Sequence, residues 1–329
     1  MNNQLARLIL DYQKSVQTAV ALMYRSGIQM PSSCADWIET DIPLSGTLDG
    51  GAHYIKHGAG CEVSLTAEKV DFDFGKHGEI DGFDVWRLVK YAGVNLVNYG
   101  FGAIDEVQDS FEKSVTDGSI VYSGDCLYYT ADVQRLFAVD VDCRVSGDML
   151  PSRDHDPVLT LYAHYFLAAD LMRKNYEKLN SKWSECGRLS GDNEVKLRIY
   201  ISSWLGFLGV TCAGFRDLNM RLLLQSNRPE SFQELIPISD GIGRMMKKHS
   251  NPLREFRNNV FHLRKNLDVT RNFFAIGEDR LPWAHELHEA IAGFLSEYRI
   301  LCEVHYVMHG RKGEMDSNRF KKRQKLRRS

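Results

Sequence analysis

Short alternating segments dominate the first part of the chain, and hydrophobic residues spaced by three and four dominate the second part. In residues 70–74, one Val and two Phe alternate with two Asp, which is the period of a strand with one buried face. Residues 4–25 instead carry the stripe of an amphipathic helix. The other elements predicted here are strands at 53–55 and 61–65, helices at 83–91 and 104–115, and a hairpin of 119–122 with 126–129. Together they predict a small α+β domain over residues 1–137.

Residues 138–156 contain Asp, Arg, Ser, Gly and Pro with little apolar periodicity, and they predict a linker. The helices predicted after it span 158–183, 193–225, 241–248, a segment from 251, and a last segment from 281. The second of these is apolar nearly all round, as expected of a central helix, and Gly206, Gly209 and Gly214 would let its neighbours approach closely. We therefore expect an all-α, up-and-down bundle over 157–309. Residues 310–329 predict a basic, disordered tail.

The segment after Ser250 carries the candidate chemistry. Asn251 followed by Pro252 predicts a helix start, because Pro lacks only an N–H that a first turn leaves unpaired. The apolar stripe of this helix is Leu253, Phe256, Val260, Leu263 and Leu267. The opposite side carries Arg254, Arg257, Asn258, Phe261 and His262. Guanidinium groups bind phosphate, and imidazole transfers protons at neutral pH, so this side favours phosphodiester chemistry without a metal.

Arg257-Asn258-Asn259-Val260-Phe261-His262 resembles the Arg-X4-6-His signature of HEPN domains, which are helical and include many metal-independent ribonucleases of bacterial toxin and defence systems. The resemblance covers roughly residues 156–309. It implies an endoribonuclease in which His262 takes a proton from a ribose 2′-OH, Arg257 holds the phosphate, and Asn258 orients either group. It also implies 2′,3′-cyclic phosphate products and a homodimer in which two motif helices form one composite site.

Residues five apart on a helix point about 140° from each other, so Arg257 and His262 do not converge within one helix. Phe261 lies between them, and we interpret it as an anchor of the dimer interface; packing under another helix of its own domain is the alternative. The candidate RNA-binding residues are Arg254, Arg264, Lys321, Lys322 and Arg323. Two other interpretations of the motif stay open: an ordinary solvated helix face, and a HEPN-like fold without catalysis.

Three segments of the first domain, His57 to Cys61, Asp71 to Gly75 and Gly82 to Leu88, resemble a small uncharacterised bacterial domain family found beside toxin and immunity genes. That resemblance implies no chemistry. Six side chains there could ligate a metal in principle, or form a hydrogen-bonded turn and a polar sheet face: His53, His57, His77, Asp71, Asp73 and Asp84. No pair has a recognisable ligand spacing, so we predict no metal and no cofactor.

Charge is unevenly distributed in a chain whose formal net charge is −2. Residues 36–84 contain eleven acids and three Lys, whereas residues 319–328 contain seven basic residues and no acid. This asymmetry suggests RNA as one partner and, alternatively, an interaction or immunity-type protein whose acidic N-terminal domain binds a protein. The seven cysteines are scattered, and the chain has neither a signal peptide nor an apolar run long enough to cross a membrane, so a cytoplasmic location is expected.

Overall fold

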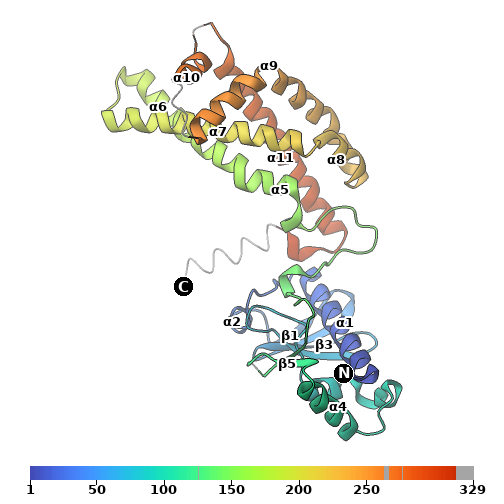
Figure 1. The fold of residues 1–329 in the computed structure, drawn as a ribbon. Helices are drawn as coiled ribbons and strands as arrows, with labels where there is room; N and C mark the ends of the chain where they lie inside the picture. Colours follow the sequence, from blue (N-terminus) through green and yellow to red (C-terminus); the bar gives the residue numbers. More distant parts are fainter. Residues whose placement is uncertain (125, 263–266, 276, 316–329) are drawn as a thin grey trace. The chain divides into compact units, whose positions relative to one another are not determined.

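A computed structural model describes residues 1–124, 126–262, 267–275 and 277–315 (Figure 1). These residues form two compact units. The N-terminal unit comprises Met1–Arg144 together with the described residues from Tyr306 onward, and the helical unit comprises Val145–His305. In chain order, the helical unit is therefore an insertion between two segments of the N-terminal unit. No helix of the described residues is long and apolar enough to span a lipid bilayer.

The N-terminal unit is built on a four-stranded antiparallel meander in the order β1-β2-β3-β4. Its strands are β1 (Ser45–Thr47), β2 (His53–His57), β3 (Gly60–Ser64) and β4 (Lys69–Asp73). Val70, Phe72 and Phe74 are buried as the alternation predicted, and they pack in one core with the apolar stripe of α1 (Asn3–Arg25). The strands predicted at 53–55, 61–65 and 70–74 are therefore confirmed, while β1 was not foreseen.

The remaining elements of this unit surround that core. They are α2 (Cys34–Ile38), α3 (Val85–Ala92), α4 (Ile104–Thr116) and the hairpin of β5 (Ile120–Tyr122) with β6 (Tyr128–Thr130). Short 3-10 turns lie at Asp49–Gly51, Gly93–Tyr99, Ala138–Asp140 and Lys312–Glu314. The α+β character predicted for the first part of the chain is confirmed.

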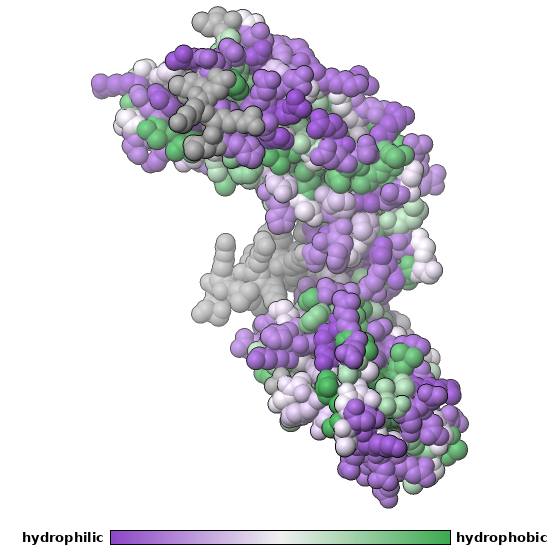
Figure 2. Space-filling model, viewed as in Figure 1, coloured by the Kyte–Doolittle hydropathy of each residue, from purple (hydrophilic) through white to green (hydrophobic). Residues whose placement is uncertain are grey.

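The helical unit contains only helices and turns among its described residues. They are α5 (Pro157–Leu161), a π-helical turn (Tyr162–Phe166), α6 (Leu167–Cys186), α7 (Gly191–Asp217), α8 (Met220–Ser226), α9 (Ile236–Phe261), α10 (Leu267–Phe273) and α11 (Arg280–Met308), with 3-10 turns at Arg153–His155 and Glu230–Leu235. Trp204, Leu205 and Leu208 of α7 are fully buried, so this helix is central as predicted. Figure 2 shows hydrophobic residues exposed among hydrophilic ones over α6 and α7.

The glycines of α7 mark the closest helix approaches. A Cβ on Gly206 would lie 2.8 Å from the ring of Phe261, one on Gly209 would lie 3.1 Å from Cβ of Arg257, and one on Gly214 would lie 2.5 Å from a methyl carbon of Leu161. The predicted role of these three residues is confirmed. The small size of Gly206 and Gly209 lets α9, which carries the motif, lie against the central helix, and that of Gly214 admits Leu161 of α5.

One predicted helix is interrupted, and one predicted helix start coincides with a kink. The helix predicted over 193–225 breaks at Asn219, which adopts a left-handed conformation (φ +47°), and continues as α8. Asn tolerates this conformation better than most residues. The helix start predicted at Asn251 falls within the bounds of α9, but His249 has non-helical torsions (φ −133°, ψ 31°), so α9 consists of two helices joined at a kink, and the second begins close to the predicted position. The missing N–H of Pro252 removes one bond from the helix ladder beside this kink.

The segment after α11 also differs from the prediction. Residues 310–315, which the sequence assigns to a disordered tail, pack in the N-terminal unit, where Arg311 and Glu314 are buried and paired. The buried carboxylate of Glu314 accepts from Nε of Arg311 at 2.6 Å and from Nη2 at 2.8 Å. A basic composition therefore did not preclude burial here, because the guanidinium meets a carboxylate three residues away. The rest of the predicted tail lies outside the described residues.

Candidate active site and basic groove

The motif lies at the end of α9, and its apolar stripe faces the core as predicted. Leu253 and Phe256 are buried, and the ring of Phe256 lies 4.8 Å from that of Phe273 in α10. The stripe does not continue as predicted, because α9 ends at Phe261 and Leu267 begins a separate helix. Nδ2 of Asn259 donates to Thr270 in α10 at 3.1 Å. These contacts hold α10 against the end of α9.

Arg257 and Asn258 are joined through their side chains. Nε and Nη2 of Arg257 both donate to Oδ1 of Asn258, at 3.2 and 2.8 Å. The two residues are half-buried, and no carboxylate of the described residues pairs with Arg257. Asn258 therefore orients the guanidinium and leaves its full positive charge in place, which suits a group that binds an anion.

His262 is not part of the helix. It is the residue at which α9 ends, its backbone is extended (φ −118°, ψ 137°), and its N–H donates to the carbonyl of Asn258 at 3.1 Å. The separation of about 140° expected between Arg257 and His262 assumes a helix that continues through His262, whereas α9 ends at this residue. The His262 side chain is exposed at the end of the helix, one turn beyond Asn258.

Phe261 packs within its own unit. Its ring centroid lies 5.1 Å from that of Phe207 in α7, and its edge rests on Gly206. The side chain is still 42% exposed. The alternative that Phe261 packs under another helix of its own domain therefore accounts for part of the ring, and the dimer stays a prediction.

Replacing Phe261 by Asp tests that prediction. If the exposed part of the ring anchors a second copy, Phe261→Asp is expected to yield a helical monomer, because the interface would bury an unpaired carboxylate. Light scattering measures the oligomeric state, and circular dichroism measures the helix content. Val195→Asp, a change at another exposed apolar position in α7, is the matched control. An unchanged oligomeric state in both variants contradicts the dimer interface.

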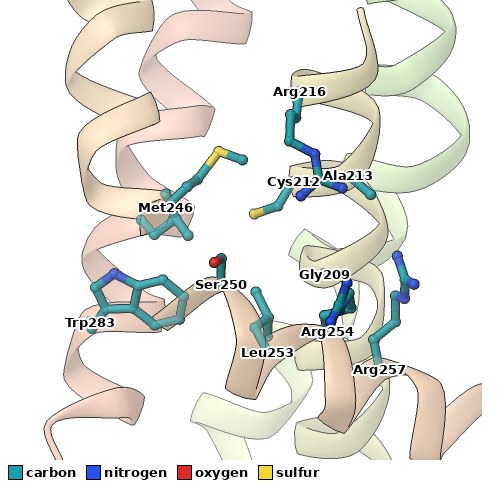
Figure 3. Close-up of a pocket in the computed structure, with 11 residues that line it drawn as sticks. Gly209, Cys212, Ala213, Arg216, Met246, Ser250, Leu253, Arg254, Arg257 and Trp283 are labelled. Carbon is teal, nitrogen blue, oxygen red and sulfur yellow. The ribbon is translucent and has the colours of Figure 1, made fainter. Parts of the chain in front are cut away.

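Beside the motif, α7, α8, α9 and α11 enclose a groove made of two adjoining cavities. The narrow cavity, which has room for about one water molecule (30 Å³), has Met246 and Trp283 on one side and Arg216, Arg254 and Arg257 on the other (Figure 3). The wide cavity of about 600 Å³ extends along the first part of α9 to the junction of α7 and α8. Both cavities are lined by Arg216, Met246 and Ser250, so they form one groove, which we call the basic groove.

The groove has a strong excess of positive charge. The described residues that line it include one carboxylate, Asp240, and six cations: Arg216, Arg221, Arg244, Lys247, Arg254 and Arg257. Asp240 pairs with Arg221 at 2.6 Å. Arg244, Lys247 and Arg254 are exposed and pair with no carboxylate within the part of the chain that the structure describes. Such a groove attracts a polyanion.

The kink of α9 is held by the start of α11. Asp279 pairs with both Lys248 and His249, and the Nε2 of His249 lies 2.8 Å from its carboxylate. Hydrogen bonds from Lys248 and His249 lower the pKa of Asp279, so it is ionised at neutral pH. Trp283 donates from Nε1 to the carbonyl of Met245 at 2.9 Å, which satisfies an acceptor just before the kink. These contacts fix the angle between the two parts of α9 that line the groove.

Cys212, which also lines the narrow cavity, is not a reactive thiol. Burial raises its pKa to about 12, so it is protonated at neutral pH. His288 and His305 of α11 are buried. Nδ1 of His288 accepts from Nε1 of Trp204 at 3.2 Å, its Nε2 lies 3.4 Å from Asp170, and burial lowers its pKa to about 4. His305 lies 2.9 Å from Asp148.

The structure brings only part of the predicted RNA-binding set together. Arg254 lines the basic groove beside Arg257, whereas Arg264, Lys321, Lys322 and Arg323 lie outside the described residues. Sequence reasoning missed the groove residues of α7, α8 and the first part of α9. A signal was present in α9, where the cations at 244, 247, 254 and 257 are spaced by three, seven and three, which places them on one side of a helix.

Three carboxylates of the N-terminal unit converge on one guanidinium. Arg87 of α3 pairs with Asp71 at 3.3 Å, with Asp73 at 2.7 Å, and with Asp84, which caps the same helix. His57 lies 3.2 Å from Asp71. These carboxylates raise the pKa of Arg87, although its burial opposes the effect. The arrangement is the polar sheet face named above as the alternative to a metal site. Within the described parts of the chain, no three His, Cys, Asp or Glu side chains converge as metal ligands.

This ion-pair cluster lies inside the segment of the chain that matches a family model. Residues 5–130 match the family model of a domain of unknown function, DUF6896. The DUF6896 match runs from α1 to β6, and it supports the resemblance of the first part of the chain to an uncharacterised domain family. It includes neither the helical unit nor the segment 306–315 that completes the N-terminal unit. Comparisons with curated proteins and with solved structures found no significant match.

Proposed function

We propose that the helical unit binds RNA in the basic groove and cleaves it without a metal ion at Arg257, Asn258 and His262. The observation that carries this proposal is the charge of the groove, where six cations face one carboxylate. Arg257 lies at the end of the groove, and the exposed imidazole of His262 follows at the end of the same helix. The HEPN-like sequence motif supports the cleavage step.

In the proposed reaction, neutral His262 accepts the proton of a ribose 2′-OH, and the 2′-oxygen attacks the adjacent phosphorus. The bond from phosphorus to the 5′-oxygen breaks as the new bond forms, and the 5′-oxygen takes up a proton from the solvent. Arg257 stabilises the charge that builds on the non-bridging oxygens. Asn258, a positioning residue, holds the guanidinium through its two hydrogen bonds. The products carry a 2′,3′-cyclic phosphate and a 5′-OH.

A second candidate is a protein that binds RNA or another partner without cleaving it. It is favoured by the position of His262 beyond the helix end, because no contact joins its ring to Arg257 within the described residues. In this alternative, the acidic N-terminal unit would bind a protein, and the helical unit would supply affinity only. The two candidates share the groove and differ in the chemistry at His262.

Incubating the purified chain with total RNA in excess EDTA tests the proposed cleavage. We expect products with 2′,3′-cyclic phosphate ends, and we expect His262→Ala to lower the rate by about 10²- to 10⁴-fold, the range for loss of a general base. Arg257→Ala should lower it at least as far, since it removes the charge that stabilises the transition state.

His164→Ala is the matched control, because His164 is an exposed histidine of the same unit and lies outside the groove. Cleavage at the wild-type rate by both motif variants contradicts the assignment. Binding of RNA without cleavage by the wild-type chain supports the second candidate.

A further inference from the structure

The wide end of the basic groove has a composition that the cleavage motif does not explain. The apolar part of its lining, which we call the apolar floor, consists of Phe215, Met220, Leu222 and Met246; Phe215 and Met220 are almost fully buried, and Leu222 is 60% exposed. The polar part of the lining includes Arg221, Arg244, Lys247 and Asp240, together with the side chains of Asn219 and Ser239. A simple phosphate-binding surface needs the cations only, so the apolar floor indicates a ligand that also has an apolar face.

The size of this end fits one such group. A cavity of about 600 Å³ lies within the range of small-molecule sites, which is about 300–1,000 Å³. It is open because the chain turns at Asn219, whose left-handed conformation directs α8 away from the line of α7. The narrow end, by contrast, holds only about one water molecule, and three guanidiniums line it. The groove is therefore a nucleoside-sized cavity followed by a cationic constriction.

We propose that the wide cavity is a subsite for one unpaired nucleotide of a single-stranded RNA, with the adjoining phosphates held by Arg244 and Lys247 and at the constriction by Arg216 and Arg254. Proteins that hold single strands combine a positively charged groove with side chains, usually aromatic, on which the bases stack; in this groove, Leu222 and Met246 would contact the base instead. In a duplex the base faces are stacked on each other, and they cannot reach the floor at Leu222 and Met246. The inference rests on the proposed function in one respect only, which is that the polyanion in the groove is RNA.

The experiment measures binding in the full-length His262→Ala protein, so that cleavage does not interfere. The probe is a short fluorescein-labelled oligoribonucleotide, either single-stranded or annealed to its complement, and the readout is fluorescence anisotropy at a series of salt concentrations. Arg244→Gln with Lys247→Gln is expected to weaken single-strand binding and to lower the salt slope, d log K/d log[salt], by about 1.4 in magnitude, because each phosphate contact on a single strand contributes about 0.7.

Leu222→Ser isolates the apolar floor. Leu222 is 60% exposed, so its replacement leaves the core intact. We expect it to weaken single-strand binding without changing the salt slope, and to reduce the preference over duplex. Lys178→Gln with Lys182→Gln removes two exposed charges of α6 outside the groove and serves as the control, with affinity and slope close to those of the parent protein.

The outcomes separate the subsite from the cleavage proposal. Unchanged affinity and slope in the Arg244/Lys247 variant, or equal affinity for duplex and single strand, overturn the subsite even if the wild-type chain cleaves RNA. A strand that binds through Arg244, Lys247 and Leu222 but is never cleaved by wild-type protein overturns the cleavage step and supports the subsite. If neither form of the RNA binds, both proposals are wrong.

Discussion

Replacing Asp156 by alanine is expected to lower the free energy of unfolding of the helical unit by about 3–5 kcal/mol, the range for removing one partner of a buried ion pair. Asp156 is fully buried. Its Oδ1 accepts from the backbone N–H of Val158 at 2.8 Å and from Nη2 of Arg228 at 3.1 Å, and its Oδ2 accepts from the hydroxyl of Tyr298 at 2.7 Å. Alanine would remove a helix cap and leave the charge of Arg228 buried without its carboxylate.

Chemical denaturation followed by Trp fluorescence measures this loss. Asp192→Ala is the matched control, because Asp192 lies in the first turn of α7 and pairs with Lys196 at the surface, with 74% of its side chain exposed. Exposed pairs of this kind contribute at most about 1 kcal/mol. Equal losses in the two variants would show that the network of Asp156, Arg228 and Tyr298 does not hold the unit together.

The second large effect concerns the N-terminal unit. Glu314→Ala is expected to lower its free energy of unfolding by about 3–5 kcal/mol, because it removes the carboxylate that accepts twice from the buried Arg311 guanidinium. The same carboxylate lies 3.2 Å from Sγ of Cys143, and burial together with Glu314 raises the pKa of this thiol to about 12. The substitution would therefore remove contacts to both segments of the unit, to Cys143 in the first and to Arg311 in the second.

Lys312→Ala is the control for this change, since Lys312 pairs with Asp49 at the surface, where both side chains are about half exposed. Its expected effect is below about 1 kcal/mol. A similar stability of the Glu314 and Lys312 variants in thermal unfolding contradicts the prediction. The same contacts matter for testing the candidate RNA-binding residues Lys321, Lys322 and Arg323 by truncation: truncation after Met315 keeps this packing, whereas truncation after Gly310 removes it.

The sequence predicted most elements that depend on local periodicity. Strict alternation identified β4, and the apolar stripe of α1 gave its extent within a few residues. The small residues of α7 correctly marked the close helix approaches. These signals are local because burial of one face imposes a fixed period on the residues that form it.

What the sequence could not predict depends on partners far apart in the chain. Asp156 was assigned to a linker, because its role requires Arg228 and Tyr298, which follow about 70 and 140 residues later. The end of α9 before His262 coincides with contacts from α10 to Asn259 and Phe256, which no helical period encodes. Composition predicts Arg311 in a basic, disordered tail, because composition alone does not reveal the carboxylate of Glu314 and the aromatic ring of Tyr306 that contact it.

The insertion of Val145–His305 between two segments of the N-terminal unit has a consequence for synthesis of the chain. A ribosome adds about 5–20 residues per second, so the segment from Tyr306 follows Arg144 only after a delay on the order of 8–30 s. During that interval, two parts of the unit lack their final contacts. One is the surface of α1 around Tyr24, which Gly313 covers in the complete chain, and the other is the thiol of Cys143, which lies beside Glu314. The nascent N-terminal unit therefore remains incomplete until the inserted helices have been translated, and a chain that stops within them leaves it open to chaperones and proteases.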